Sequence, residues 1–105
     1  MAYATSAWTT LADPTRRTVF ARVVERPSSV SELARALPVS RPAVSQHLKV
    51  LKDAGLVIDR RIGRQRIYRV NQQGLAAFRA EIARFWDKTL AAYKWAAEQP
   101  EEETV

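Results

Sequence analysis

The chain has 105 residues, a net charge of +6 and an apolar content of 47%. This length suits one globular domain with a modest core and is short for an enzyme with a deep pocket. No apolar run approaches the roughly 20 residues of a membrane-spanning helix, and the first ten residues lack the basic residue and apolar core of a secretory signal. The absence of cysteine excludes disulfides and thiolate metal sites, and we expect a protein of the reducing cytoplasm with no membrane partner.

The first part of the chain predicts two helices. A short helix is expected over residues 5–12. Asp13 followed by Pro14 indicates the start of the second, because Asp caps helix N-termini and Pro suits the first helical position. This helix is expected to run to about Arg26, where Pro27 ends it. Its apolar residues at helical spacing are Val19, Phe20, Val23 and Val24.

Two further helices are predicted to form a tight helix-turn-helix. Ser29 and Glu32 have the spacing of a capping box at the start of the third helix, which Pro38 ends. The apolar stripe of this helix is Val30, Leu33, Ala34 and Leu37. Only Val39 and Ser40 then separate it from the fourth helix, so the connection must be a tight turn.

The fourth helix is expected to have one buried face and one polar face. Ser40 is its predicted cap, and Gly55 suits the position just after its end. The buried stripe is Val44, Leu48 and Leu51. The opposite face presents Arg41, Pro42, Ser45, Gln46 and Lys49.

The periodicity of the chain then changes from about 3.6 to about 2, which indicates strands. Leu56 and Ile58 alternate with their neighbours, residues 67–70 alternate in the same way, and the segment 62–64 around Gly63 predicts a hairpin tip. An irregular basic loop is the alternative interpretation. The β-branched and aromatic content of the two runs argues against that loop.

A long final helix is predicted from Gln72 or Leu75 to Glu98, with Asn71 as its candidate cap. Its apolar stripe is Leu75, Phe78, Ile82, Phe85, Trp86, Leu90, Tyr93 and Ala97. A helix of about 24 residues spans about 36 Å, which is more than a small domain covers, so part of the stripe is expected to meet a partner. Residues 1–99 are expected to form the domain, and residues 100–105 an acidic, disordered tail.

The positive charge is concentrated in one stretch. From Arg41 to Arg69 there are eight basic and two acidic residues, and this surplus equals the net charge of the whole chain. A local positive surface beside a helix of groove-entering size indicates a polyanionic partner, above all duplex DNA.

The order of the predicted elements is that of a winged helix-turn-helix, which is mainly α with a β-hairpin wing (α-α-α-α-β-β-α). Three segments carry a family resemblance: residues 11–17 (LADPTRR), residues 30–34 (VSELA) and above all residues 45–57 (SQHLKVLKDAGLV). Over about residues 11–97 the chain resembles bacterial ArsR/SmtB-type repressors. The resemblance implies a homodimer, joined through the first and last helices, that binds an operator and blocks transcription.

The polar face of the fourth helix has the chemistry for reading base edges. Gln46 can pair bidentately with adenine, Arg41 can pair with guanine or hold a phosphate, and Ser45 can reach either kind of group. Pro42 can touch a thymine methyl group, and Ser40 lies at a helix N-terminus, where phosphates bind. A merely solvated helix face is the alternative.

The wing adds arginines that can reach flanking phosphates or a narrow minor groove. Arg64, beside Gly63, is the best candidate for the tip. Arginines kept only for solubility are the alternative. The full predicted DNA-binding set is Ser40, Arg41, Pro42, Ser45, Gln46, Lys49, Arg60, Arg61, Arg64 and Arg66.

Part of the aromatic stripe must be core, and the remainder is expected to form the dimer seam. The predicted dimer-interface residues are Trp8, Leu11, Phe78, Ile82, Phe85, Trp86, Leu90 and Tyr93. Trp95 lies off the main stripe, either exposed or in a ligand pocket. A two-fold dimer would place its two recognition helices about 34 Å apart, one turn of DNA.

The chain departs from the metal-sensing members of the family that it resembles. Those members use cysteines on the third helix, or histidine and carboxylate ligands on the last one. This chain has no cysteine, and its last helix has carboxylates but no histidine, so we expect the metal-independent branch, with no cofactor. His47, the single histidine, is expected to be structural or to contact the DNA backbone. No residue pattern in the sequence indicates a small-molecule effector.

Two other functions are compatible with the sequence. The domain could bind nucleic acid without sequence preference, or its wing could bind an acidic protein as an adaptor. An enzyme is not expected, because the sequence has no evident histidine–carboxylate pair, no glycine-rich phosphate loop and no cysteine nucleophile.

Overall fold

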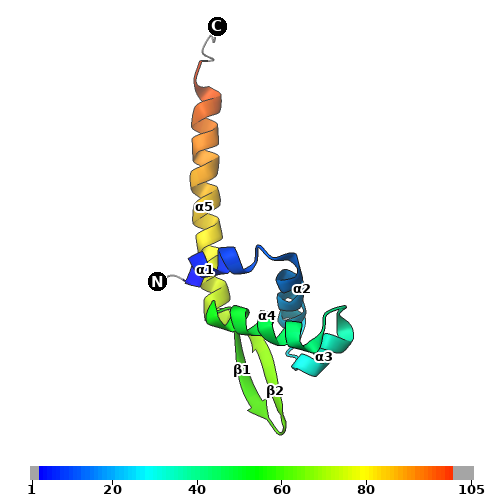
Figure 1. Ribbon diagram of the computed structural model, residues 1–105. Coiled ribbons are helices and arrows are strands. Elements are labelled where there is room, and N and C mark those ends of the chain that lie inside the picture. The colour runs from blue at the N-terminus through cyan, green and yellow to red at the C-terminus, as the bar shows by residue number, and fades with distance from the viewer. Residues whose placement is uncertain (1–2, 101–105) are drawn as a thin grey trace.

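The computed structural model describes residues 3–100, so residues 101–105 of the expected acidic tail lie outside the described part of the chain. Figure 1 shows a small helical body, a hairpin projecting from one end and one long helix leaving at the other. Within residues 3–100, no helix is both long enough and apolar enough to cross a bilayer.

The elements follow the predicted order. They are α1 (Tyr3–Thr10), α2 (Pro14–Glu25), α3 (Val30–Ala36), α4 (Arg41–Asp53), β1 (Val57–Ile62), β2 (Gln65–Val70) and α5 (Gln72–Glu98). This arrangement confirms the mainly α winged helix-turn-helix with a hairpin wing.

The predicted capping residues explain where three of the helices begin. Asp13 and Ser40 each accept a hydrogen bond from a backbone N–H three residues later, at 3.0 and 3.3 Å. Ser29 and Glu32 form the complete capping box, in which each side chain bonds the other residue's backbone N–H. These bonds satisfy amide groups that a helix N-terminus otherwise leaves without a partner.

The core lies where α2, α3 and α4 meet the base of the hairpin and the start of α5. Its buried apolar residues are Ala7, Val19, Phe20, Val23, Leu33, Val44, Leu48, Leu51, Ala54, Leu56, Val57 and Phe78. Val24, which the sequence groups with the apolar stripe of α2, is 43% exposed. It lies on the rim of a shallow, open hollow beside Leu11 and Leu75, where no further element covers it.

The two strands form an antiparallel hairpin whose base is attached to the body. Val57 pairs with Val70 at the base, and Ile62 pairs with Gln65 beside the tip. Gly63 has a φ of +64° in the turn, a conformation that favours glycine. The backbone of Ser28 also exchanges two hydrogen bonds with β2, which fixes the hairpin to the segment before α3.

The two faces of β1 differ in burial. Val57 is 1% exposed and the side chain of Asp59 is 6% exposed, whereas Ile58 is 37% exposed. Val57 and Asp59 therefore face the body, and Ile58 faces outward. A buried carboxylate is costly unless it is paired, and two basic side chains pair with Asp59.

The start of α5 is fixed against the end of α4. Asn71, the expected cap, makes no side-chain cap bond; its amide donates instead to the carbonyl oxygen of Gly55 at 2.9 Å. Gly74 packs so closely on the same carbonyl that an added Cβ would lie 1.8 Å from its oxygen. These contacts set the direction in which the rest of the helix leaves the body.

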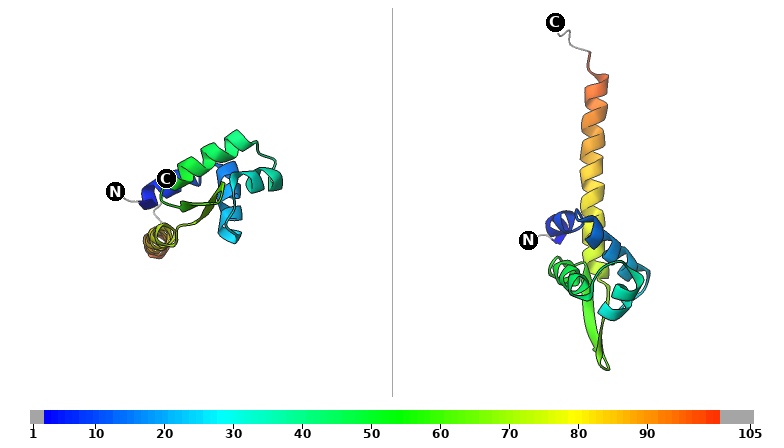
Figure 2. Two further views of the ribbon diagram at one scale, coloured as in Figure 1. Left: turned by 90° about the horizontal axis from the view of Figure 1, so that it is seen from below. Right: turned by 45° about the vertical axis from the view of Figure 1, so that its right-hand side comes forward.

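Beyond Phe78, the last core residue, α5 runs away from the body. The molecule measures 67 × 27 × 22 Å along its principal axes, and the right view of Figure 2 shows that α5 makes up most of its length. The prediction of a helix too long for its own domain to cover is confirmed.

Candidate nucleic-acid interface

The polar face of α4 is solvent-exposed as predicted. Val44, Leu48 and Leu51 are fully buried on its inner side. The exposed positions at and beyond its start are Ser40, Arg41, Pro42, Ser45, Gln46 and Lys49. The helix thus presents short polar and basic side chains outward while its apolar stripe anchors it in the core.

Two basic residues of this face have partners within the protein. The guanidinium of Arg41 donates to Ser31 Oγ on α3, which joins the two helices of the helix-turn-helix. Lys49 pairs with Asp53 one turn later, at 3.2 Å, and both side chains are well exposed. An exposed pair of this kind contributes little to stability, so Lys49 can exchange Asp53 for a phosphate at small cost.

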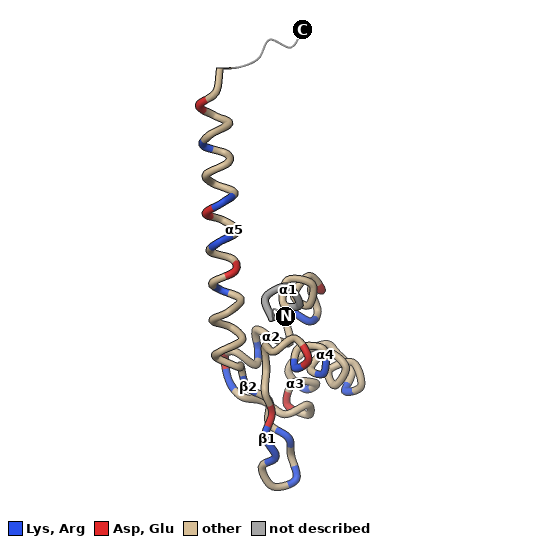
Figure 3. The backbone as a smooth tube through the Cα atoms, turned by 90° about the vertical axis from the view of Figure 1, so that its left-hand side faces the viewer, with Lys and Arg blue, Asp and Glu red and all other residues tan. Residues whose placement is uncertain are grey.

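The wing carries five of the eight basic residues between Arg41 and Arg69, and Figure 3 shows Lys and Arg gathered along the hairpin with one acid near its base. All four predicted wing arginines are exposed: Arg60, Arg61, Arg64 and Arg66. Arg61 Nε donates to the carbonyl oxygen of Gly63 at 3.3 Å, across the tip. No described carboxylate lies within ion-pair distance of Arg60, Arg61 or Arg64, which leaves these three charges for an external anion.

The inward-facing Asp59 holds the wing to α4. Its carboxylate pairs with Lys52 Nζ at 2.9 Å and with Arg66 Nη1 at 2.8 Å. The hydrogen bond from Lys52 is the main cause that lowers the pKa of Asp59, and Arg66 adds to it against the opposing effect of burial. Arg66 is therefore committed in part to the protein itself, unlike Arg60 and Arg64.

Sequence reasoning missed two contributors to this surface. They are Asp59 and Ser31, whose contacts no local sequence pattern indicates. Both depend on tertiary contacts. Asp59 pairs with Lys52 of α4 and Arg66 of β2, and Ser31 of α3 bonds Arg41 of α4. A hollow of about 190 Å³ between the wing and α3 likewise joins residues that are distant in sequence, Ser29 to Ser31 and Arg64 to Arg66.

His47 lies half-buried on α4. Its Nδ1 atom is buried without a hydrogen-bond partner among the described residues. Within residues 3–100, no three His, Asp or Glu side chains gather as a metal site would require.

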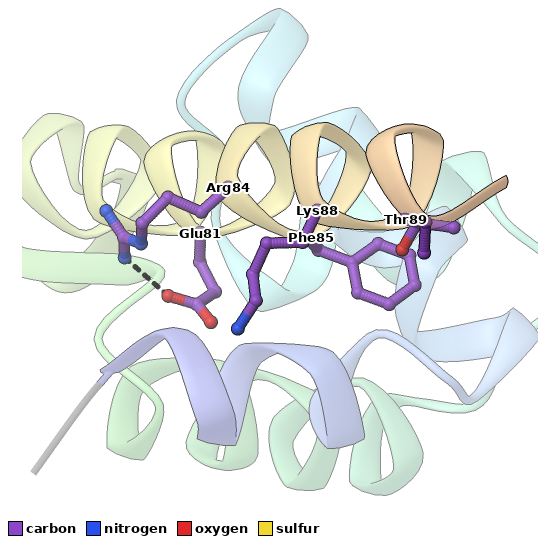
Figure 4. A pocket seen from close by; sticks show the side chains of 6 residues that line it. Glu81, Arg84, Phe85, Lys88 and Thr89 are labelled. Atoms are coloured by element: carbon purple, nitrogen blue, oxygen red, sulfur yellow. Dashed lines mark hydrogen bonds and ion pairs between the residues drawn. The ribbon is translucent and has the colours of Figure 1, made fainter. Parts of the chain in front are cut away.

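A second surface, on α1 and α5, is aromatic. Trp8 lies edge-on to Phe78 and to Phe85, with ring centroids 5.3 and 5.7 Å apart, and Phe85 lies edge-on to Trp86 at 5.3 Å. Phe85 also lines a hollow of about 550 Å³ on α5, where Figure 4 shows it near Lys88 and Thr89 and shows Glu81 paired with Arg84.

The predicted seam residues divide into two groups in the structure. Trp8, Phe85, Trp86, Leu90 and Tyr93 are exposed. Leu11 and Ile82 are half-buried against the core. Phe78, expected in the seam, is only 9% exposed and belongs to the core of the chain itself, where its ring lies edge-on to Trp8. Trp95 is exposed.

Comparisons with known proteins agree with this geometry. Residues 11–60, from the end of α1 into the wing, match a helix-turn-helix domain family. The chain is 56% identical over 87 residues to the HTH-type transcriptional regulator Rv2034 of Mycobacterium tuberculosis, covering 83% of this chain and 81% of that protein. It is 46% identical over 66 residues to the HTH-type transcriptional repressor SmtB of the same species, covering 63% of this chain and about half, 49%, of SmtB.

A solved structure matches over nearly the whole chain. The ArsR-like transcriptional regulator from Rhodococcus sp. RHA1 superposes with a TM-score of 0.75 and 35% identity, covering 93% of this chain and 95% of that one. Helix-turn-helix, wing and long final helix are thus shared with regulators, none of which is described as an enzyme. The chain belongs to the ArsR/SmtB family of winged helix-turn-helix transcriptional regulators.

Proposed function

We propose that this regulator is a homodimeric repressor that binds a pseudo-palindromic DNA operator in the cytoplasm. One observation carries the proposal. The polar face of α4 and the wing arginines that pair with no described carboxylate are both exposed to solvent. The side chains of Gln46 and Ser45 have no hydrogen-bond partner among the described residues. The Gln46 amide and the Ser45 hydroxyl are therefore available for base edges.

Direct readout and backbone binding are divided between the two elements. We assign base contacts to Arg41, Pro42, Ser45 and Gln46 in the major groove. We assign phosphate or minor-groove contacts to the wing, chiefly Arg60 and Arg64, with Arg61 and Arg66 beside them, and to Ser40 and Lys49 on α4. Phosphate contacts position a protein on DNA, whereas base contacts select the sequence.

Dimerisation is supported by the exposed aromatic surface of α1 and α5. Its exposed members are Trp8, Phe85, Trp86, Leu90 and Tyr93. A contiguous apolar surface of this kind is unusual on a monomer and is stabilised by burial against a second copy. A two-fold axis beside α5 would present two copies of α4 to successive turns of one DNA face.

Selection of binding sites from random duplex DNA tests this function. We expect enrichment of two half-sites related by a dyad, about 10 base pairs from centre to centre. Failure to enrich any motif, with binding that is equal for all sequences, would instead support a non-specific nucleic-acid-binding module.

The variant Gln46→Ala tests base readout within the same assay. Its affinity for the selected duplex should fall by about 5–150-fold, corresponding to about 1–3 kcal/mol, while its affinity for a scrambled duplex stays the same. Lys49→Gln is the matched control, because loss of a phosphate contact weakens binding to both duplexes alike. Equal losses on both duplexes with Gln46→Ala would contradict a base-reading role.

A further inference from the structure

A second basic cluster lies outside the surface described so far. A hollow of about 260 Å³ between the end of α2 and α3 is lined by Arg22, Arg26, Ser28, Glu32, Arg35 and Ala36. The three arginines of this hollow form the α2–α3 arginine cluster: Arg22 lies in α2, Arg26 is the C-cap of α2, and Arg35 lies in α3. The charge count along the sequence does not reveal them, because acids elsewhere in the chain cancel them.

The cluster has a surplus of positive charge that the protein does not neutralise. No described carboxylate lies within ion-pair distance of Arg22, Arg26 or Arg35. Glu32, the one acid in the hollow, is engaged in the capping box, where its Oε1 accepts from the backbone N–H of Ser29 at 2.8 Å. That backbone bond is the main cause that lowers the pKa of Glu32, and the charges of Arg26 and Arg35 also lower it.

The cluster continues the basic surface of the helix-turn-helix. Arg41, at the start of α4, donates to Ser31 on α3, and Arg35 follows Ser31 by one helical turn. Arg22 and Arg26 are likewise one turn apart at the end of α2. Basic side chains therefore extend from the start of the recognition helix across α3 to α2.

The wing lies on the other side of the same segment. The hollow between the wing and α3 begins at Ser29, next to Ser28 in the arginine hollow. Ser28 also pairs with Tyr68 of β2 through two backbone hydrogen bonds, at 3.0 and 2.8 Å. A duplex lying against α4 and the wing would thus run past the start of α3 toward the cluster.

We propose that Arg22, Arg26 and Arg35 bind backbone phosphates of the duplex beyond the base pairs that α4 and the wing contact. This inference rests on the proposed DNA-binding function and adds an outer contact to each half-site. Arginine is suited to the task because its planar guanidinium binds two phosphate oxygens at once and never loses its charge. The contact is independent of sequence and lengthens the bound segment.

The test compares two double variants of the full chain. Arg26→Gln/Arg35→Gln removes two exposed charges from the cluster, and Lys88→Gln/Lys94→Gln removes two exposed charges from α5. Binding to a fluorescein-labelled 40-base-pair duplex of mixed sequence is measured by anisotropy between 50 and 200 mM salt. Thermal melting confirms that each variant is folded.

The cluster variant should lose salt dependence as well as affinity. Each phosphate contact contributes about 0.9 to the slope of log K against log salt, so four lost contacts per dimer should reduce the slope by about 3–4. The α5 variant should keep the slope of the unmodified protein. Arg26→Lys/Arg35→Lys, which keeps the charge, should retain most of the slope.

The outcomes separate this inference from the function on which it rests. If the unmodified protein binds the duplex but the cluster variant has the slope and affinity of the α5 variant, the outer contact is wrong and the proposed function stands. If the unmodified protein does not bind the duplex in dilute buffer, both are wrong.

Discussion

At the scale of single residues, Asp59 decides how the wing is held. Its inward-facing carboxylate bonds Lys52 of α4 and Arg66 of β2, so three elements meet at one charge. Its lowered pKa means that the folded state prefers the ionised form more strongly than the unfolded state does. This contribution to stability is complete above the ordinary aspartate pKa of about 3.9 and is lost as the pH falls through the lower folded value.

Substitution of Asp59 should therefore have a pH-dependent effect. Asp59→Asn should lower the free energy of unfolding at pH 7 by roughly 1–2 kcal/mol, because two charge-assisted bonds are lost. The difference between variant and unmodified protein should shrink toward zero as the pH approaches 2, where the carboxyl group is protonated. Urea denaturation between pH 2 and pH 7 measures both, and a difference that is constant over this range would exclude the ion-pair explanation.

Acid sensitivity from other residues provides a check on this experiment. Hydrogen bonds from backbone amides also lower the pKa of Asp13 and of Glu32 at their helix caps. Both carboxylates remain in the Asp59→Asn variant, so it should still lose stability in acid, with a shallower pH dependence than the unmodified protein.

At the scale of elements, the contact between α4 and α5 depends on a glycine inside a helix. In the interior of a helix, alanine is normally more favourable than glycine by about 1 kcal/mol. At Gly74, however, a Cβ would collide with the carbonyl oxygen of Gly55 at 1.8 Å, and that atom belongs to the backbone. Gly74→Ala should therefore destabilise the fold by about 1–3 kcal/mol despite its better helix propensity.

Urea denaturation of Gly74→Ala measures this effect, and Gln73→Ala is the control. Gln73 is the exposed neighbour on the same helical turn, and its substitution should change stability by less than about 0.5 kcal/mol. A Gly74→Ala variant as stable as the unmodified protein would show that α5 can shift without cost.

Elements that depend on local chemistry could be predicted from the sequence, as the helix starts show. The capping box of Ser29 and Glu32 and the cap at Ser40 involve residues three positions apart, so the pattern contains the whole interaction. The same local pattern predicts a cap at Asn71. There, however, the side-chain amide donates to the carbonyl oxygen of Gly55, and this tertiary contact replaces the cap bond.

Interactions between distant residues could not be predicted in the same way. The ion pairs of Asp59, the packing of Gly74 and the arginine cluster of α2 and α3 each depend on how elements lie against one another. Phe78 and Leu90 occupy the same stripe of α5, yet Phe78 is core and Leu90 is exposed. The difference follows from where the body ends along the helix, which periodicity does not report.

At the scale of the whole molecule, the uncovered half of α5 is the feature on which the proposed homodimer rests. Leu90 is 57% exposed and lies on the face proposed as the dimer seam. Leu90→Glu would place an unpaired charge in that seam, so the dimer dissociation constant should rise about 100-fold or more. Sedimentation velocity measures this change, and circular dichroism should show an unaltered helix content.

The matched control places the same charge on the other side of the helix. Ala91 is exposed and by helical spacing points away from the aromatic stripe, so Ala91→Glu should leave the sedimentation coefficient unchanged. Dissociation of both variants alike would mean that the seam lies elsewhere on α5.

The mass of the protein–DNA complex tests the symmetric arrangement most directly. On one duplex that contains the selected sequence, sedimentation equilibrium should find two chains per duplex, and a duplex with one half-site scrambled should bind far more weakly. One chain per duplex at full affinity would contradict a dimer that presents α4 twice.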